Sequence, residues 1–399
     1  MTRTALAACL LLVALVGAAG CTQRSDGVAQ TPPIDVASAD LSGSGPGSVV
    51  EAKTIPNIDR EIRKLGGQAA RVVYRSTSGI DGQPTEVSGA VFVPVGKPPA
   101  GGWPVIAFAH GTSGINPACG PSQSPDLFGA SGLIAKYLDL GFAVAAADYQ
   151  GLGHPGAHPY LDAKTAGLNV IDSVRALRKV FHGISEAWAV FGGSQGGGAA
   201  WAANEQAATY ATELDLVGSV SLVPAADISG FAAAAADGSL SKDQQAAYIW
   251  VLMGLERSYP DFNIDDYRRG IVKDNWDVLS ACSGPEAERR AAILADVPAD
   301  DLRPATPEAE RRLAEILQQM ALPQQRAAAP MQIYYGGEDT YINPEWTAAA
   351  ISRACAMGDT IEAFFQEDRG HGDIDGSAYL GWLGERFQDM PAPNTCGAG

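Results

Sequence analysis

One serine stands in a setting that favours nucleophilic chemistry. Ser194 is the central residue of the run GGSQG at 192–196, which fits the pattern G-x-S-x-G, and no other serine of the chain does. The pattern directly follows an apolar run at 189–191 and precedes an Ala-rich stretch. A strand–turn–helix of this kind projects the hydroxyl above a sheet and points backbone N–H groups at developing negative charge. We therefore predict a nucleophile here; the alternative is a Gly-rich structural turn.

A serine nucleophile needs a base, and the base needs a carboxylate that orients it. His371 is the sole histidine after Ser194, in the run RGHGD at 369–373, just past an expected strand. In the chain order serine, acid, histidine, the acid is Asp339, which follows an earlier expected strand. The adjacent Glu338 competes, but the short G-x-D spacing, with Pro344 five residues on, favours Asp339.

Two backbone amides would complete such a site by binding an oxyanion. Gln195, directly after the nucleophile, supplies one, and we expect Thr112, in the run AHGTSG at 109–114, to supply the other. His110 in the same run either braces this loop or is an ordinary strand-end histidine. The run DYQGLG at 148–153 either contacts substrate or shapes a Gly turn, and we favour the turn.

The elements needed to bring these residues together are strands alternating with helices. Near-continuous apolar runs are typical of parallel strands whose two faces are both covered by helices, and the alternation predicts an open α/β sheet. Helical patterns cover 168–180 and 197–208, and the mixed charges of 172–179 indicate a solvated helix face. The expected strands are 87–93, 105–109, 143–147, 189–191, 216–222, 333–335 and 361–365.

The alternation breaks at 228–327, where helical patterns occur without a strand signal. Thr306 and Pro307 begin a helix whose apolar residues recur at spacings of three and four. We expect a helical cap inserted over a pocket, rather than a second domain, between core segments 51–227 and 328–399. Trp250, Tyr259 and Trp276 of this insertion either line an acyl pocket or pack its helices.

The N-terminal residues indicate export. Residues 1–20 have a positive start and an uncharged apolar run that is short for a membrane-spanning helix. The run AAGC at 18–21 resembles a bacterial lipobox, in which Cys21 is acylated, although ordinary signal cleavage also suits these small residues. Residues 21–50 are polar and rich in Gly, Ser and Pro, which predicts a disordered tether. We expect a lipoprotein on the outer face of the cell membrane, or otherwise a secreted protein.

The number of cysteines and the composition of the chain indicate its compartment and exclude one class of partner. Loss of Cys9 with the signal and acylation of Cys21 would leave an even number of cysteines for an oxidising compartment, namely Cys119, Cys282, Cys355 and Cys396. The 399 residues, 46% of them apolar, suffice for a packed core. A formal net charge of −17 without any basic stripe argues against a nucleic-acid partner.

Together these residues resemble the secretory lipase family of α/β-hydrolases, found in fungi and actinobacteria. The resemblance extends from about 87 to 372 and rests on the runs at 109–114, 147–153, 158–160, 172–176, 193–197 and 210–214. It implies an α/β-hydrolase fold, with a mostly parallel sheet flanked by helices and a helical cap, that cleaves acyl esters without a metal or cofactor. It also implies the disulfides Cys119–Cys282 and Cys355–Cys396, whereas four cysteines by themselves allow three pairings.

The function expected is therefore a serine hydrolase for acyl esters or lipids, of lipase or esterase type, in which Ser194, His371 and Asp339 form an acyl-enzyme. Two alternatives stay open. The same three residues would serve a serine peptidase acting on short peptides. A catalytically inactive lipoprotein that binds a lipid or polymer could also retain them as a vestige.

Overall fold

The computed structural model describes residues 31–397. The expected signal peptide, the acylation of Cys21 and the first part of the tether lie outside the described residues. Within this range, no helix is both long enough and apolar enough to span a membrane.

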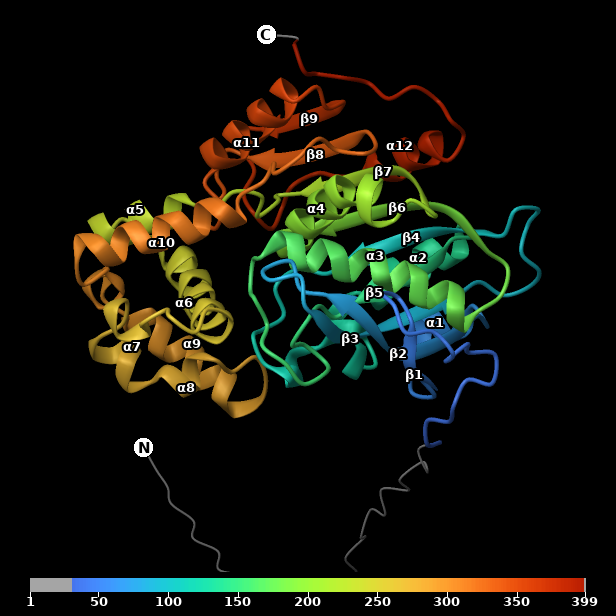
Figure 1. Ribbon diagram of the computed structural model, residues 1–399, viewed down its shortest axis with the longest axis horizontal. Coiled ribbons are helices and arrows are strands. Elements are labelled where there is room, and N and C mark those ends of the chain that lie inside the picture. Colours follow the sequence, from blue (N-terminus) through green and yellow to red (C-terminus); the bar gives the residue numbers. More distant parts are fainter. Residues whose placement is uncertain (1–30, 398–399) are drawn as a thin grey trace, which may run out of the picture.

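A nine-stranded sheet in the order β1-β2-β3-β5-β4-β6-β7-β8-β9 forms the centre of the molecule (Figure 1). The strands from β5 and β4 to β9 run parallel, whereas β1, β2, β3 and β5 pair antiparallel in that order. The mostly parallel sheet predicted from the apolar runs is thus confirmed. The strands are β1 Val49–Thr54, β2 Gln68–Thr77, β3 Pro84–Val93, β4 Trp103–Ala109, β5 Ala143–Ala147, β6 Ile184–Gly193, β7 Asp215–Leu222, β8 Met331–Gly336 and β9 Ile361–Gln366.

Helices cover both faces of the sheet, which explains why the central strands β4 and β5 are apolar throughout. In β4, Val105, Ala107 and Ala109 pack with α3 and α4, whereas Ile106 packs on the opposite face with α2 and α12. The helices that flank the sheet are α1 Arg60–Lys64, α2 Ser131–Asp139, α3 Ala163–Val180, α4 Gln195–Tyr210, α11 Pro344–Ala356 and α12 Tyr379–Arg386.

Between β7 and β8 the chain forms a separate group of helices beside the core (Figure 1). Their apolar residues make a cluster of their own, which also takes in Ile115 and Tyr160 from loops of the core. This group, the cap, consists of α5 Gly230–Asp237, α6 Lys242–Ser258, α7 Gly270–Asp274, α8 Trp276–Leu279, α9 Gly284–Asp296 and α10 Pro307–Met320. The helix that begins after Thr306 buries Leu313, Ile316, Leu317 and Met320, as their spacing predicts.

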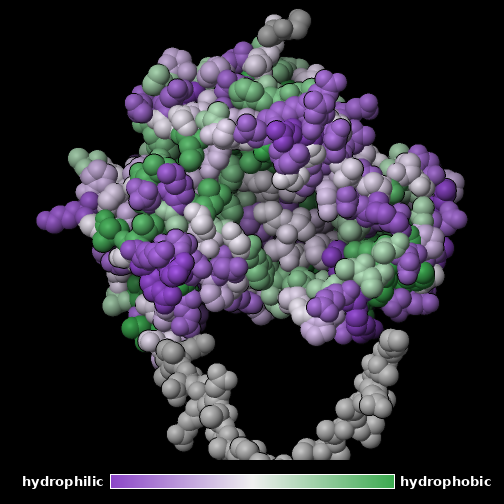
Figure 2. Space-filling view, turned by 180° about the vertical axis from the view of Figure 1, so that it is seen from behind, coloured by the Kyte–Doolittle hydropathy of each residue, from purple (hydrophilic) through white to green (hydrophobic). Residues whose placement is uncertain are grey.

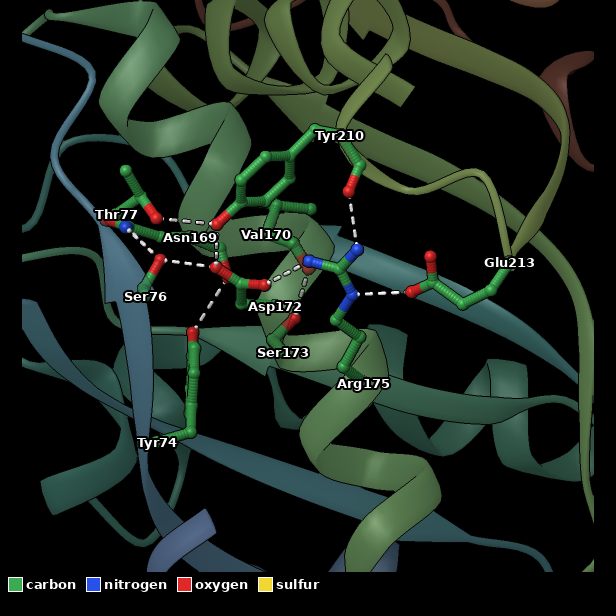
Figure 3. Close-up of polar contacts among 10 residues, drawn as sticks. All are labelled: Tyr74, Ser76, Thr77, Asn169, Val170, Asp172, Ser173, Arg175, Tyr210 and Glu213. Carbon is green, nitrogen blue, oxygen red and sulfur yellow. Dashed lines mark hydrogen bonds and ion pairs between the residues drawn. The ribbon is translucent and has the colours of Figure 1, made fainter. Parts of the chain in front are cut away.

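Two sequence expectations were wrong. Part of the expected tether is ordered: Thr54 N–H donates to Ile34 O at 2.9 Å, and Val36 and Ala39 pack against the core, so these apolar residues supply the burial that the composition concealed. The helix face at 172–179 is not uniformly solvated either. The side chain of Asp172 is fully buried and accepts hydrogen bonds from Ser76, Tyr210 and Arg175 at 2.7, 2.9 and 2.8 Å (Figure 3).

Candidate active site

A sharp turn between β6 and α4 presents Ser194. The serine has φ +57° and ψ −120°, a conformation that L-residues rarely adopt. Its N–H donates to Leu222 O at 2.9 Å, and its carbonyl accepts from Ala225 N–H at 3.0 Å. A Cβ at Gly196 would overlap the carbonyl oxygen of Ala109, so the close approach to β4 requires glycine there.

The three side chains singled out in the sequence meet at the carboxyl end of the sheet. The Ser194 hydroxyl donates to His371 Nε2 at 2.8 Å, and His371 Nδ1–H donates to Asp339 Oδ2 at 2.8 Å. Asp339 Oδ1 accepts from the N–H groups of Tyr341 and Ile342 at 2.8 and 2.9 Å. The Asp339 side chain is only 3% exposed, so this buried carboxylate is held rigidly against the imidazole. Glu338, the competing residue, is exposed.

The two oxyanion candidates flank the serine. Gln195 is the first residue of α4, where a backbone N–H has no acceptor within the helix, and Thr112 lies in the wall of the pocket that contains Ser194. The buried Gln195 side chain donates through Nε2 to His158 Nε2 at 3.1 Å, and His158 Nδ1–H donates to Gln150 O at 2.8 Å. Burial lowers the pKa of His158 to about 3, so it stays neutral and can accept this bond.

His110 and the run 148–153 hold the loop that carries Thr112 in place. The His110 ring stacks on Tyr149 at 4.3 Å, and its nitrogens lie 2.6 Å from Gly111 O and 3.0 Å from Asp148 O. Burial lowers the pKa of His110. The Tyr149 hydroxyl donates back to His110 O at 2.8 Å. These bonds fix the loop that carries Thr112, and no residue of 148–153 lines the pocket.

A pocket of about 510 Å³ opens above Ser194 and His371 between the core and the cap. The surface is visibly hollowed where the two meet (Figure 2). Trp250 lines this pocket, whereas Tyr259 and Trp276 pack within the cap. The remaining lining residues are Thr112, Tyr160, Leu161, Ala225, Ala246, Ala247, Arg290, Tyr341, Ile342 and Gly372. Among the described residues, no group of three His, Cys, Asp or Glu side chains is placed to hold a metal ion.

Tyr160, Tyr341, His158 and Arg290 were not predicted as site residues. The run 158–160 carried part of the family resemblance, which was a usable signal for His158 and Tyr160. Tyr341 lies two residues after Asp339, and its ring is 4.8 Å from that of His371. Arg290 had no signal, because the charged run ERR at 288–290 is typical of an exposed helix.

Covalent and polar contacts join the cap to the loop that carries Thr112. Cys119 is bonded to Cys282, and Cys355 to Cys396, the pairing that the resemblance implied. Beside the first disulfide, Arg257 of α6 donates to Ile115 O at 2.5 Å and to Asn116 Oδ1 at 3.1 Å. The cap is therefore fixed to the core at residues 115–119, a few positions after Thr112.

The α/β-hydrolase fold is evident from solved structures. The closed state of Candida antarctica lipase A has a TM-score of 0.71, with 17% identity over 88% of this chain and 85% of that chain. The rice cell wall degrading esterase LipA from Xanthomonas oryzae has a TM-score of 0.63, with 18% identity over 86% and 97%. At these identities the likeness shows the fold alone.

The sequence model of the Secretory lipase family matches residues 130–285, which confirms the resemblance drawn from the motifs. A Mycobacterium tuberculosis protein described as a probable inactive lipase is 24% identical over 369 residues, 87% of this chain and 79% of that protein. The segment that the family model matches lies within the range over which the motifs carry the resemblance.

Proposed function

We propose that this protein is an exported serine hydrolase that cleaves carboxylic acyl esters. The observation that carries the proposal is the His371 imidazole, hydrogen-bonded at 2.8 Å to both the Ser194 hydroxyl and the Asp339 carboxylate. A histidine placed in this way can take the serine proton while the carboxylate stabilises the imidazolium. The largely apolar pocket wall above Ser194 suits an acyl chain.

In the proposed reaction, Ser194 Oγ attacks the ester carbonyl and its proton passes to His371 Nε2. The amides of Gln195 and Thr112 would hold the resulting oxyanion, and each donor of this kind is worth about 10²–10³ in rate. The intermediate then expels the alcohol, which takes the proton from His371, and leaves an acyl group on Ser194. Water, deprotonated by His371, releases the acid and restores the hydroxyl.

The test is Ser194→Ala, assayed with 4-nitrophenyl esters. We expect nearly complete loss of turnover with an unchanged circular dichroism spectrum, because the side chain is not part of the apolar core. Turnover close to that of the wild type would eliminate the assignment. A panel of aminoacyl amides, run beside the esters, separates an esterase from a peptidase of the same fold.

The description of the mycobacterial relative favours one second candidate, a catalytically inactive lipid-binding protein. A fluorophosphonate probe discriminates between the two, since it forms a bond only with an activated serine. Labelling of the wild type but not of Ser194→Ala supports the hydrolase, and an unlabelled wild type supports the inactive protein.

We also propose attachment to the outer face of the membrane through an acylated Cys21. The two disulfides support an oxidising compartment. Metabolic labelling with an alkyne fatty acid tests the anchor. Label present in the wild type and absent from Cys21→Ala is expected, and equal labelling of both would contradict it.

A further inference from the structure

Arg290 places a permanent positive charge in the wall of the candidate active-site pocket. It projects from α9 and lines the same cavity as Ser194 and His371. Its guanidinium carbon lies 3.9 Å from the centre of the Trp250 ring, and its Nε–H donates to Leu279 O at 3.1 Å. The stack and the hydrogen bond together fix the plane of the guanidinium.

This cation has no acidic partner in the part of the chain that the structure describes. Among the described residues, no carboxylate lies within 4.0 Å of Arg290, and its terminal NH₂ groups have no hydrogen-bond acceptor. Arg268 makes the same kind of stack on Trp276, yet it pairs with Asp265 at 3.2 Å. An arginine that stacks on tryptophan can thus also form an ion pair, so the stack on Trp250 is not the reason why Arg290 has no acidic partner.

The neighbours of the guanidinium in the pocket cannot neutralise it. Tyr160 and Tyr341 are the aromatic hydroxyl residues of this wall, and burial raises the pKa of both, so they stay uncharged. The terminal nitrogens of Arg290 are not among the buried polar atoms that lack a hydrogen-bond partner, so they are accessible to water or to a bound anion. Because the chain carries a net charge of −17, an anion would need a local cation of this kind to enter the pocket.

We infer that Arg290 binds an anionic group of the substrate, a carboxylate or a phosphate, so that the pocket takes esters that carry a negative charge away from the scissile bond. This rests on the proposed ester hydrolysis and defines its substrate class. The two free NH₂ groups match the paired oxygens of either anion. A charge-assisted hydrogen bond of this kind changes binding by about 10- to 100-fold.

Two matched substrate pairs test the inference and distinguish the sources of charge. Mono(4-nitrophenyl) glutarate and 4-nitrophenyl valerate differ in a carboxylate on the acyl chain; 1-butyrylglycerol 3-phosphate and 1-butyrylglycerol differ in a phosphate on the alcohol. We expect a kcat/KM ratio of charged to neutral ester above one in one pair. Arg290→Met, which keeps an apolar chain on Trp250, should lower this ratio at least tenfold, and Arg290→Lys should lower it less.

Arg289→Met is the matched control. Arg289 is the preceding residue of α9, has a side chain 60% exposed and paired with Glu286 at 2.9 Å, and its loss changes the net charge equally. We expect it to retain the wild-type ratio. A wild type that prefers the neutral ester in both pairs, or an Arg290→Met variant that slows both members equally, would overturn the inference.

Calorimetric binding of the same esters to Ser194→Ala separates this inference from the proposed function. In the pair for which the wild type prefers the charged ester, that ester should bind at least tenfold more tightly than its neutral partner, and Arg290→Met in the Ser194→Ala background should abolish the difference. This result does not require turnover. Hydrolysis without any charge preference would instead keep the proposed function and reject the role of Arg290.

Discussion

The buried carboxylate of Glu205 should make the free energy of unfolding depend on pH. Glu205 of α4 is 1% exposed, and its Oε2 accepts from the N–H groups of Gln324 and Gln325 at 3.0 and 3.4 Å. Its Oε1 is buried without a hydrogen-bond partner. Burial therefore outweighs the two donors and raises the pKa of Glu205 from 4.5 to about 7.

The sign and size of the effect follow from this pKa. Between pH 4.5 and 7 the folded protein holds a proton on Glu205 that the unfolded chain has released, so stability falls as the pH rises through this window. Above pH 7 the full effect on the free energy of unfolding is about 3 kcal/mol. Glu205→Gln removes the titrating group but keeps the shape of the side chain. The free energy of unfolding of this variant, minus that of the wild type, should therefore increase by about 3 kcal/mol from pH 4 to pH 8.

Urea unfolding of both proteins at pH 4, 6 and 8, with disulfides intact, measures this difference and cancels the other titrating groups. Glu308→Gln on α10 is the control, because that side chain is 73% exposed and the charge change is the same. A difference between Glu205→Gln and the wild type that stays constant from pH 4 to pH 8 would refute the reasoning.

Three further outcomes are expected. Asp339→Asn should lower kcat by about 10⁴ without unfolding the protein, measured with 4-nitrophenyl esters, because the imidazole loses its orienting charge; a loss below tenfold would contradict this. Replacing Cys119 and Cys282 by Ser should lower the free energy of unfolding by about 5 kcal/mol if the 163-residue separation sets the loop entropy, as urea titration would measure. Gly196→Ala should abolish activity and lower Tm, since its Cβ would overlap Ala109 O.

The sequence predicted the parallel part of the sheet well, because short, continuous apolar runs that alternate with helical patterns are typical of parallel strands covered on both faces. The expected strand at 143–147 coincides with β5, and the others differ from the structure only at their ends. The strands β1 and β2 were missed. In β2, Arg71 and Arg75 interrupt the apolar residues, since this antiparallel strand has partly exposed positions and its pattern resembles that of a loop.

Some residues of the candidate site could be predicted from local sequence patterns, whereas others depend on tertiary packing. The motif around Ser194 and the chain order of Asp339 and His371 depend on backbone turns at strand ends, and a single sequence carries these. Arg290 depends on how α9 packs against α6 across the cap. No local pattern encodes that packing, so a charged residue on an amphipathic helix could not be distinguished from a solvated one.

Four of the seven non-glycine residues with a positive φ in the described part of the chain lie at the rim of the candidate site. Tyr149 follows β5, Ser194 follows β6 and Val223 follows β7, with φ of +72°, +57° and +40°, and Leu161 of the pocket wall has +62°. Each such residue costs on the order of 1–3 kcal/mol. At 194 a glycine would adopt this backbone without that cost, so a turn serving only structure has no use for a serine there. The hydroxyl is therefore explained by its contact with His371, which argues against the purely structural turn.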